Sequence, residues 1–171
     1  MVEINQFGAK KNFIRKWDYK KTMNREDYTK ETNKHIDTVQ HFMSVIINQL
    51  LERAHLHDRS KLENPEAKIF MEYTPKLKNS TYGSDEYNNF LKGMQVALDH
   101  HYENNRHHPD HFKNGIQDMN LVDLIEMICD WKAATLRHNN GNIFKSIEIS
   151  QERFKFSDEI KQILLNTAEL L

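Results

Sequence analysis

Apolar residues recur at intervals of three and four along most of this chain, a spacing that favours helices over strands. No segment shows the clear alternation of apolar and polar residues that marks a half-buried strand. Glycine and proline are scarce, at five and three in 171 residues, so few positions oblige a helix to stop. The pattern predicts an all-α fold, a single bundle of about six or seven helices.

The first predicted helix runs from about residue 27 to 54. We expect its apolar stripe to be buried, and the stripe comprises Ile36, Val39, Met43, Ile46, Leu50 and Ala54. A second helix should begin with Asn64 as its N-cap and Pro65 at its first helical position, and end at Pro75, followed by a loop over 76–83.

A third predicted helix is capped by Ser84 and reaches about residue 101. Residues 103–119 are polar and rich in histidine, and we expect an ordered loop there. Three more helices are predicted at about 120–138, 142–154 and 158–170. Asn120 and Ser157 are suitable N-caps, and Asn139, Asn140 and Gly141 form a suitable stop.

The first 26 residues form a predicted basic arm, which precedes a helical domain over 27–171. The basic residues of this arm are Lys10, Lys11, Arg15, Lys16, Lys20, Lys21 and Arg25, opposed by Glu3 and Asp18 in the first 25 residues. Such an arm can contact nucleic acid or anionic lipid. A solvated leader explains it as well, and the net charge of −1 gives no reason to expect nucleic acid as the partner.

Features that the sequence lacks limit the cellular compartments in which we expect the chain. It contains no run of 18 apolar residues, so we expect no membrane span, and its first 20 residues lack the apolar core of a secretory signal. Cys129 is the single cysteine, which excludes an internal disulfide and suits a reducing cytoplasm. Because Cys129 lies among apolar residues, we expect it to be a core residue rather than a nucleophile.

Two segments suggest metal chemistry. His35 lies at the edge of the first apolar stripe, so its imidazole should point near the interior, where a hydrogen-bonded core histidine is the alternative. His57 and Asp58 are adjacent and can reach one cation. Imidazole suits zinc, iron and manganese, and carboxylate suits harder ions. A His-Asp pair also arises by chance.

Acidic residues recur on the helix predicted after residue 120. Asp123, Glu126 and Asp130 share one face, which is turned either to solvent or to a cation. We expect Asp123 to be solvated. Asp130 lies between Cys129 and Trp131, so we expect it to be buried, where a metal is one of few adequate partners.

Five of the ten histidines fall close together, at His100, His101, His107, His108 and His111. Imidazoles at this density bind metal, or hold anions when protonated. A histidine-rich surface loop without a ligand is the alternative.

The order of these residues resembles the signature of the HD-domain metal-dependent phosphohydrolases: a histidine on the first helix, a His-Asp pair, and a distant aspartate. The matching residues are His35, His57-Asp58 and Asp130. Residues 57–61 resemble the HDxxK form of the motif, and residues 100–103 resemble the double-histidine segment of the HD-GYP branch. Residues 105–134 also resemble a family of uncharacterised bacterial and phage proteins, a domain of unknown function.

The chain departs from the HD pattern in three respects. Residues 59–99 contain no histidine, where branches with two or three metals carry one, although Glu66 or Glu72 could substitute. The glycine and tyrosine of the GYP signature are absent, so hydrolysis of cyclic di-GMP is not implied. The spacing from His35 to His57 is short for some branches, and His41 is a second choice for the ligand role assigned to His35.

The resemblance implies a metal-dependent phosphohydrolase. His35, His57, Asp58 and Asp130 would bind manganese, iron or zinc, and His100 or His101, with Asp58, would hold a second ion. Lys61 would pair with a phosphate oxygen or with a metal-bound acid, and Arg106 would do so in a forked manner. His107 or His108 would protonate the leaving oxygen. The expected substrate is a small phosphorylated molecule, first of all a nucleotide, because Trp131, Tyr102 and Phe112 could stack a base. The alternatives are a non-catalytic metal-containing helical module and a nucleic-acid-binding accessory protein that uses the arm.

Overall fold

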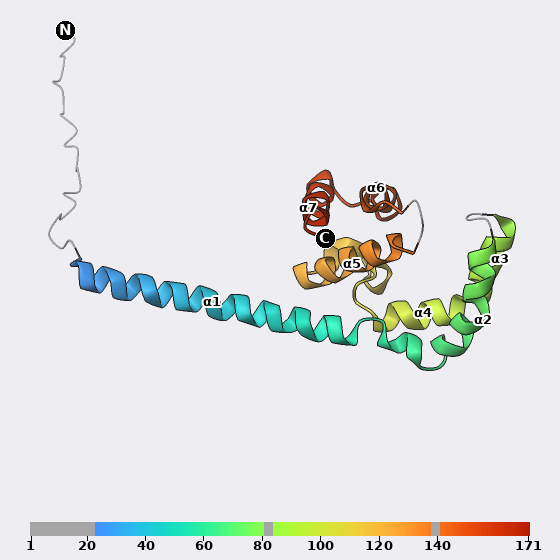
Figure 1. Cartoon of the computed structure of the whole chain (residues 1–171), viewed down its shortest axis with the longest axis horizontal. Coiled ribbons are helices and arrows are strands. Elements are labelled where there is room, and N and C mark those ends of the chain that lie inside the picture. The colour runs from blue at the N-terminus through green and yellow to red at the C-terminus, as the bar shows by residue number, and fades with distance from the viewer. Residues whose placement is uncertain (1–22, 81–83, 138–140) are drawn as a thin grey trace, which may run out of the picture. The chain divides into compact units, whose positions relative to one another are not determined.

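The computed structural model describes residues 23–80, 84–137 and 141–171, and these ranges form seven α-helices and three short 3-10 helices with no strand (Figure 1). The predicted all-α class is therefore confirmed. The helices are α1 (Arg25–Leu56), α2 (Glu66–Asn79), α3 (Asp85–Gly93), α4 (Gln95–Asn104), α5 (Leu121–Thr135), α6 (Ile143–Phe154) and α7 (Asp158–Ala168). The 3-10 helices are η1 (Arg59–Leu62), η2 (Pro109–His111) and η3 (Gly115–Asp118).

The two prolines of α2 behave differently from the prediction. Pro65 is the N-cap and not the first helical residue, and Pro75 lies inside the helix instead of ending it. A proline in a helix removes one backbone hydrogen bond without removing the others, so the chain continues for another turn to the C-cap at Ser80. Much of the predicted loop over 76–83 is thus helical, and its residues 81–83 lie outside the described ranges.

The region predicted as one helix over 84–101 consists of two, α3 and α4, which are separated at the buried residue Met94. A loop follows, as predicted, although it begins later than expected. α4 extends to Asn104, and two 3-10 turns follow before α5.

Both predicted N-caps are present. The Asn120 side chain accepts hydrogen bonds from the backbone of Val122 and Asp123, and the Ser157 side chain accepts one from Ile160. α5 ends at Thr135, short of residue 138. Of the predicted stop residues, Asn139 and Asn140 lie outside the described part of the chain.

Two compact units divide the chain, residues 1–42 and 43–171. In the first, the described residues belong mainly to α1, and the stripe residues Ile36 and Val39 are 44% and 41% exposed. In the second unit, Met43 and Ile46 are exposed as well. The prediction of a buried stripe is therefore wrong, because helical spacing shows that a face is apolar and does not show that anything covers it.

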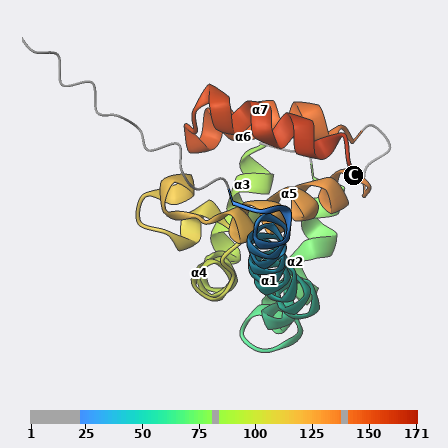
Figure 2. The same cartoon turned by 90° about the vertical axis from the view of Figure 1, so that its left-hand side faces the viewer.

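The core of the second unit lies where α6 and α7 pack side by side on α5 (Figure 2). Its buried residues are Ile116, Leu124, Met127, Ile128, Ile143, Ile147, Phe156, Leu164 and Ala168. Trp131 packs at the edge of this core. One face of α5 is thereby fixed, and its remaining faces are free to carry polar residues.

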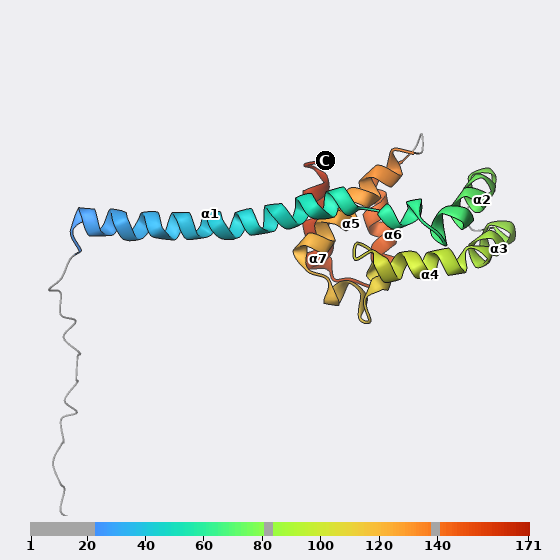
Figure 3. The same ribbon diagram turned by 90° about the horizontal axis from the view of Figure 1, so that it is seen from below.

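A second group of helices surrounds α2, which packs against α3, α4 and η1 (Figure 3). This group positions the end of α4, where His100 and His101 lie. None of the helices in the described ranges combines the length and the apolar character needed to cross a membrane.

Candidate metal centre

The centre of the candidate site is Asp58, in the turn between α1 and η1. Its backbone is left-handed, with φ 56° and ψ 15°, a conformation that aspartate adopts more readily than most residues. Such backbone positions are costly and concentrate at functional sites. The turn carries the Asp58 carboxylate away from the helix axis, and Lys61 donates a hydrogen bond of 2.6 Å to its Oδ2 atom.

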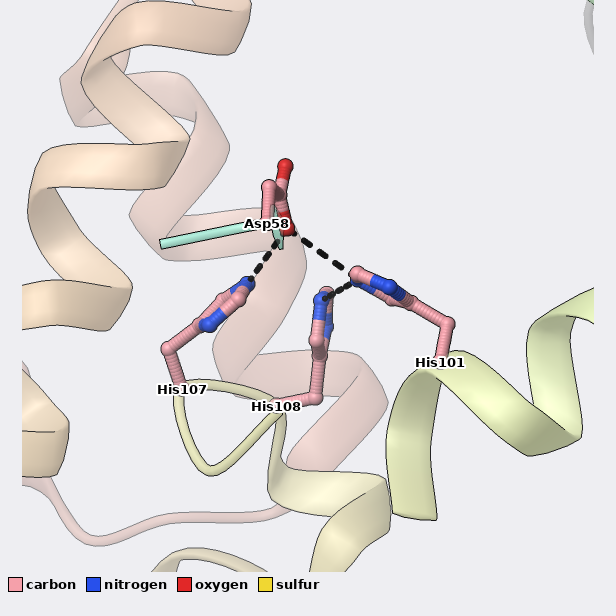
Figure 4. Close-up of side chains that lie close together, drawn as sticks. All are labelled: Asp58, His101, His107 and His108. Carbon is pink, nitrogen blue, oxygen red and sulfur yellow. Dashed lines mark hydrogen bonds and ion pairs between the residues drawn. The ribbon is translucent and has the colours of Figure 1, made fainter. Parts of the chain in front are cut away.

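Three histidines direct their Nε2 atoms at this carboxylate. The Nε2 atoms of His101 and His107 lie 3.3 and 3.6 Å from Asp58 Oδ1 (Figure 4), and that of His57 lies 3.5 Å from Oδ2. His57 Nε2 is also 3.7 Å from Asp130 Oδ1, and His101 Nε2 is 2.9 Å from His108 Nε2. Ligand atoms about 2.1 Å from one ion are about 3.0–3.4 Å apart, so these separations suit a shared cation.

These six residues, His57, Asp58, His101, His107, His108 and Asp130, are called the His–Asp cluster below. Three overlapping groups in this region hold possible ligand atoms within 4.8 Å of one another. They are Asp58 with His101, His107 and His108; His57 with Asp58 and Asp130; and His57 with His107 and Glu126. Because Asp58 belongs to two of the groups, the cluster has donors for one ion or for two.

Buried glutamates hold the other side of the imidazole rings. Glu66, which is fully buried, lies 2.8 Å from His101 Nδ1 and 2.7 Å from His100 Nδ1. Glu126 lies 2.9 Å from His57 Nδ1 and 3.1 Å from His107 Nδ1. Metal-binding histidines commonly donate their second N–H to a carboxylate in this way, which leaves Nε2 as the free donor atom.

Burial and neighbouring charged groups shift the pKa values of the residues in the cluster. Hydrogen bonds with Asp130 and then Glu126 raise the pKa of His57 to about 10. Burial, and then the neighbouring His107, lower the pKa of His108 to about 3. Burial opposes ionisation of Asp58 and Asp130, but Lys61 and His57 respectively lower the two pKa values overall. The metal-free cluster therefore holds ionised carboxylates beside a neutral imidazole.

Three buried atoms of the cluster lack a hydrogen-bond partner within the described ranges: Asp58 Oδ1, His107 Nε2 and His107 Nδ1, the last of which lies 3.1 Å from Glu126. Buried polar atoms are almost always paired, and leaving one unpaired is costly. Asp58 Oδ1 and His107 Nε2 lie beside His101, on the side of the His107 ring away from Glu126. A divalent cation would satisfy both, and the mixed nitrogen and oxygen donors fit manganese, iron or zinc.

Asp123 is buried, although the sequence suggested a solvated side chain. It receives a forked pair of hydrogen bonds from Arg106, at 2.9 and 3.1 Å, and lies 3.2 Å from Arg53. The guanidinium of Arg106 is thus engaged with Asp123 and stacks over Phe112. Its contacts do not support the predicted phosphate-binding role, and they give Arg106 a structural one.

The structure brings together four of the predicted metal ligands, His57, Asp58, His101 and Asp130. His35 is not among them: it is exposed, in the first unit, and belongs to no group of ligands found in the described residues. The same holds for its substitute, His41. The interior position predicted for His35 is wrong, because the stripe that it borders is not covered.

Other predicted roles change as well. His107 and His108, predicted as proton donors, lie among the candidate ligands, and His100 faces Glu66 instead of the cluster. Glu66 supports two histidines, which differs from the ligand role considered for it, and Glu72 pairs with Lys76. Lys61 pairs with Asp58, as one of its predicted roles required.

Glu126 is the functional residue that sequence reasoning missed. Its place on the acidic face of α5 does not by itself indicate a role, yet it contacts His57, His107 and Arg53. The available signal was its spacing of four residues from Asp130, which places both carboxylates on one side of α5.

Two of the three aromatic residues suggested for base stacking are engaged away from the cluster, and the third lies beside it. Trp131 stacks on Phe154 in the core, with ring centroids 6.4 Å apart, and Phe112 lies under Arg106. Tyr102 contacts His108 at a centroid distance of 5.0 Å. Cys129, predicted to be a core residue, is exposed.

Comparison with known families identifies one match, which covers residues 24–170 and is described as a family of unknown function, DUF5662. The chain belongs to the DUF5662 family. The match includes every member of the His–Asp cluster and both supporting glutamates. No curated protein and no solved structure matched the chain.

Proposed function

We propose that this DUF5662 protein is a metal-dependent phosphohydrolase that acts on a phosphoester of a small molecule. The observation that carries the proposal is the convergence of four imidazole Nε2 atoms on two carboxylates, with three of the rings held from behind by buried glutamates. This second layer is what a site needs if it is to hold a cation in a fixed geometry.

The ligands would come from the His–Asp cluster, and the metal would be manganese, iron or zinc, as one ion or as two that share Asp58. A divalent cation in such a site polarises a phosphoryl oxygen and makes water a stronger nucleophile near neutral pH.

The remaining groups around the cluster suit an anionic substrate. Lys61 is partly exposed and lies 2.6 Å from Asp58, so its ammonium group can also reach a phosphate oxygen that approaches the cluster. Burial keeps His108 neutral by lowering its pKa, which suits a ligand better than an acid. Trp131 and Phe112 are engaged elsewhere and only Tyr102 lies beside the cluster, so the proposed substrates are small phosphoesters in general, nucleotides included.

Elemental analysis of the purified full chain is the first test, followed by removal of metal with a chelator and reloading with manganese, zinc, magnesium, or iron under anaerobic conditions. Each form is then assayed on nucleotides, cyclic nucleotides and generic phosphoesters. We expect hydrolysis with at least one metal and its loss in His57→Ala and Asp58→Ala.

His55→Ala is a matched control, because His55 is an exposed histidine two residues from His57 and belongs to no ligand group within the described ranges. It should retain metal and activity. Hydrolysis that survives Asp58→Ala in folded protein would contradict the proposal. Stoichiometric metal without hydrolysis of any substrate would favour the alternative, a metal-containing helical module without catalysis.

A further inference from the structure

An apolar groove of about 540 Å³ lies beside the His–Asp cluster, within the second unit. One wall belongs to the last turns of α1 and the other to α5, and its apolar lining comprises Ile47, Leu50, Leu51, Ala54, Ile125, Cys129 and Ala133. Its volume lies in the range of sites that hold small organic ligands. Ile47 and Leu51 are 51% and 63% exposed, so the walls leave apolar surface for a ligand to cover.

The groove has polar residues in one region only. They are Arg53, His57, Glu126 and Asp130, and two of them, His57 and Asp130, belong to the cluster. Arg53 and Glu126 neutralise each other through a contact of 2.6 Å. One end of the groove thus lies at the candidate cation ligands, and the rest of its lining carries no charge.

We propose that this groove binds the organic part of the substrate, and that this part is an uncharged alkyl or aryl group esterified to the phosphate. The inference rests on the proposed function, since it assumes that the phosphate lies at the His–Asp cluster. An apolar group would cover Ile47, Leu51 and Ile125 while its phosphate reaches His57 and Asp130.

A nucleoside fits this groove less well. Its base edges and ribose hydroxyls need hydrogen-bond partners, and burying them unpaired is costly. Arg53 is engaged by Asp123 and Glu126, and His57 by Glu126. An alkyl or aryl group makes no such demand, and the apolar lining contributes to its binding in proportion to the area covered.

Binding of n-alkyl phosphates with two, four, six and eight carbons to the manganese-loaded full chain tests the inference, with isothermal titration calorimetry as the readout. We expect Kd to fall by about two- to fourfold for each added methylene until the groove is filled. In Ala133→Trp, the new side chain occupies the groove, and the dependence on chain length should flatten.

Ala134→Trp is the matched control. Ala134 is the next residue of α5, is exposed like Ala133, and does not line the groove. It should keep the dependence on chain length. Equal Kd values across the series in the native sequence, or equal flattening in both variants, would overturn the inference.

Cys129 supplies a second readout that needs neither metal nor turnover. It is the only cysteine in the chain and lines the groove, so its alkylation by N-ethylmaleimide can be followed by mass spectrometry. Octyl phosphate should slow the alkylation more than ethyl phosphate does, and equal rates would contradict the inference.

The two proposals fail separately. Tighter binding of longer chains, with Cys129 protected and no hydrolysis of any ester, supports the groove and overturns the phosphohydrolase. Hydrolysis with no dependence of kcat/KM or Kd on chain length supports the phosphohydrolase and overturns the groove.

Discussion

At the level of single residues, the cluster is organised by which nitrogen of each ring faces which carboxylate. His101 presents Nε2 to Asp58 and Nδ1 to Glu66, and His57 presents Nε2 to Asp58 and Asp130 and Nδ1 to Glu126. A proton held between Nδ1 and glutamate fixes the tautomer in advance. The outer carboxylates should therefore control cation affinity without touching the cation.

Glu66→Gln should weaken cation binding by about 10- to 100-fold, because it removes the charge that supports His100 and His101. A competition titration against a chromophoric chelator measures the affinity for zinc or manganese. Glu63→Gln is the matched control, since Glu63 is exposed and only three residues away. Equal affinities for the two variants would show that Glu66 has no such role.

The pKa of His57 predicts how the metal-free protein responds to pH. An unfolded histidine titrates near 6.5, whereas Asp130 and Glu126 raise the pKa of His57 to about 10 in the folded chain. A raised folded-state pKa contributes stability that is fully present below about pH 6.5 and is lost as the pH rises toward 10. The difference in unfolding free energy between the native sequence and His57→Gln should shrink over this range.

Urea denaturation in the presence of a chelator, at pH 6, 8 and 10, measures this difference. Subtracting the variant removes the titration of all other groups that the two chains share. His55→Gln provides the exposed comparison and should give a small, constant difference. A constant difference for His57→Gln would mean that the raised pKa does not stabilise the fold.

Among the elements, α5 contributes apolar residues to the core and acidic residues to the candidate site. Its apolar residues, with Met127 and Ile128 at the centre, fill the core beneath α6 and α7, while Glu126 and Asp130 face the site. The start of the helix is fixed by the capping box of Asn120 and Asp123. Asp123 also contacts Arg53 of α1 and Arg106 of the loop before α5.

Asp123→Ala should lower the free energy of unfolding by about 3 kcal/mol, because it removes a cap, leaves Arg106 without its carboxylate partner and removes one of the two carboxylates beside Arg53. Both arginines are partly exposed, so solvent limits the loss. Asp118→Ala removes an exposed aspartate that bonds only with Asn114 and should cost less than about 1 kcal/mol. Chemical denaturation of the two variants compares the costs, and similar values would contradict the bridging role.

Helix ends were predictable where one side chain determines them. Asn120 and Ser157 cap their helices as expected, since the hydrogen bonds involved lie within three residues. The continuation through Pro75 and the break at Met94 were not, because a proline does not oblige a helix to end and Met94 is not a helix-breaking residue. The fate of the α1 stripe was not predictable either, since spacing alone does not specify a covering surface.

At the scale of the whole molecule, the cluster joins four stretches of chain: the end of α1, α4, the loop after α4, and α5. His57 and Asp58 were predictable because they are adjacent. The place of His107 and His108 among the candidate ligands was not predictable, because it depends on how the loop folds back. Asn105 helps to fix that loop by donating to Ser60 and to the carbonyl of His101.

Because the ligands come from these separate stretches, a cation should bind the folded chain far better than the unfolded one. At a metal concentration of 100 times Kd, binding adds about 2.7 kcal/mol, or about 5–10 °C in Tm for a chain of this size. Differential scanning fluorimetry with and without a chelator measures the shift, which should vanish in Asp58→Ala and persist in His55→Ala. A protein shown to be metal-loaded but with an unchanged Tm would argue against a tight site.

The left-handed backbone at Asp58 has a consequence for natural variation. Glycine and asparagine fit such a position with little strain, whereas β-branched residues do not. Among the residues that fit this backbone conformation with little strain, aspartate is therefore the one that supplies a carboxylate. Asp58→Asn would leave the turn intact and remove the negative charge from the middle of the cluster. This single substitution would therefore give a folded relative with weakened cation binding.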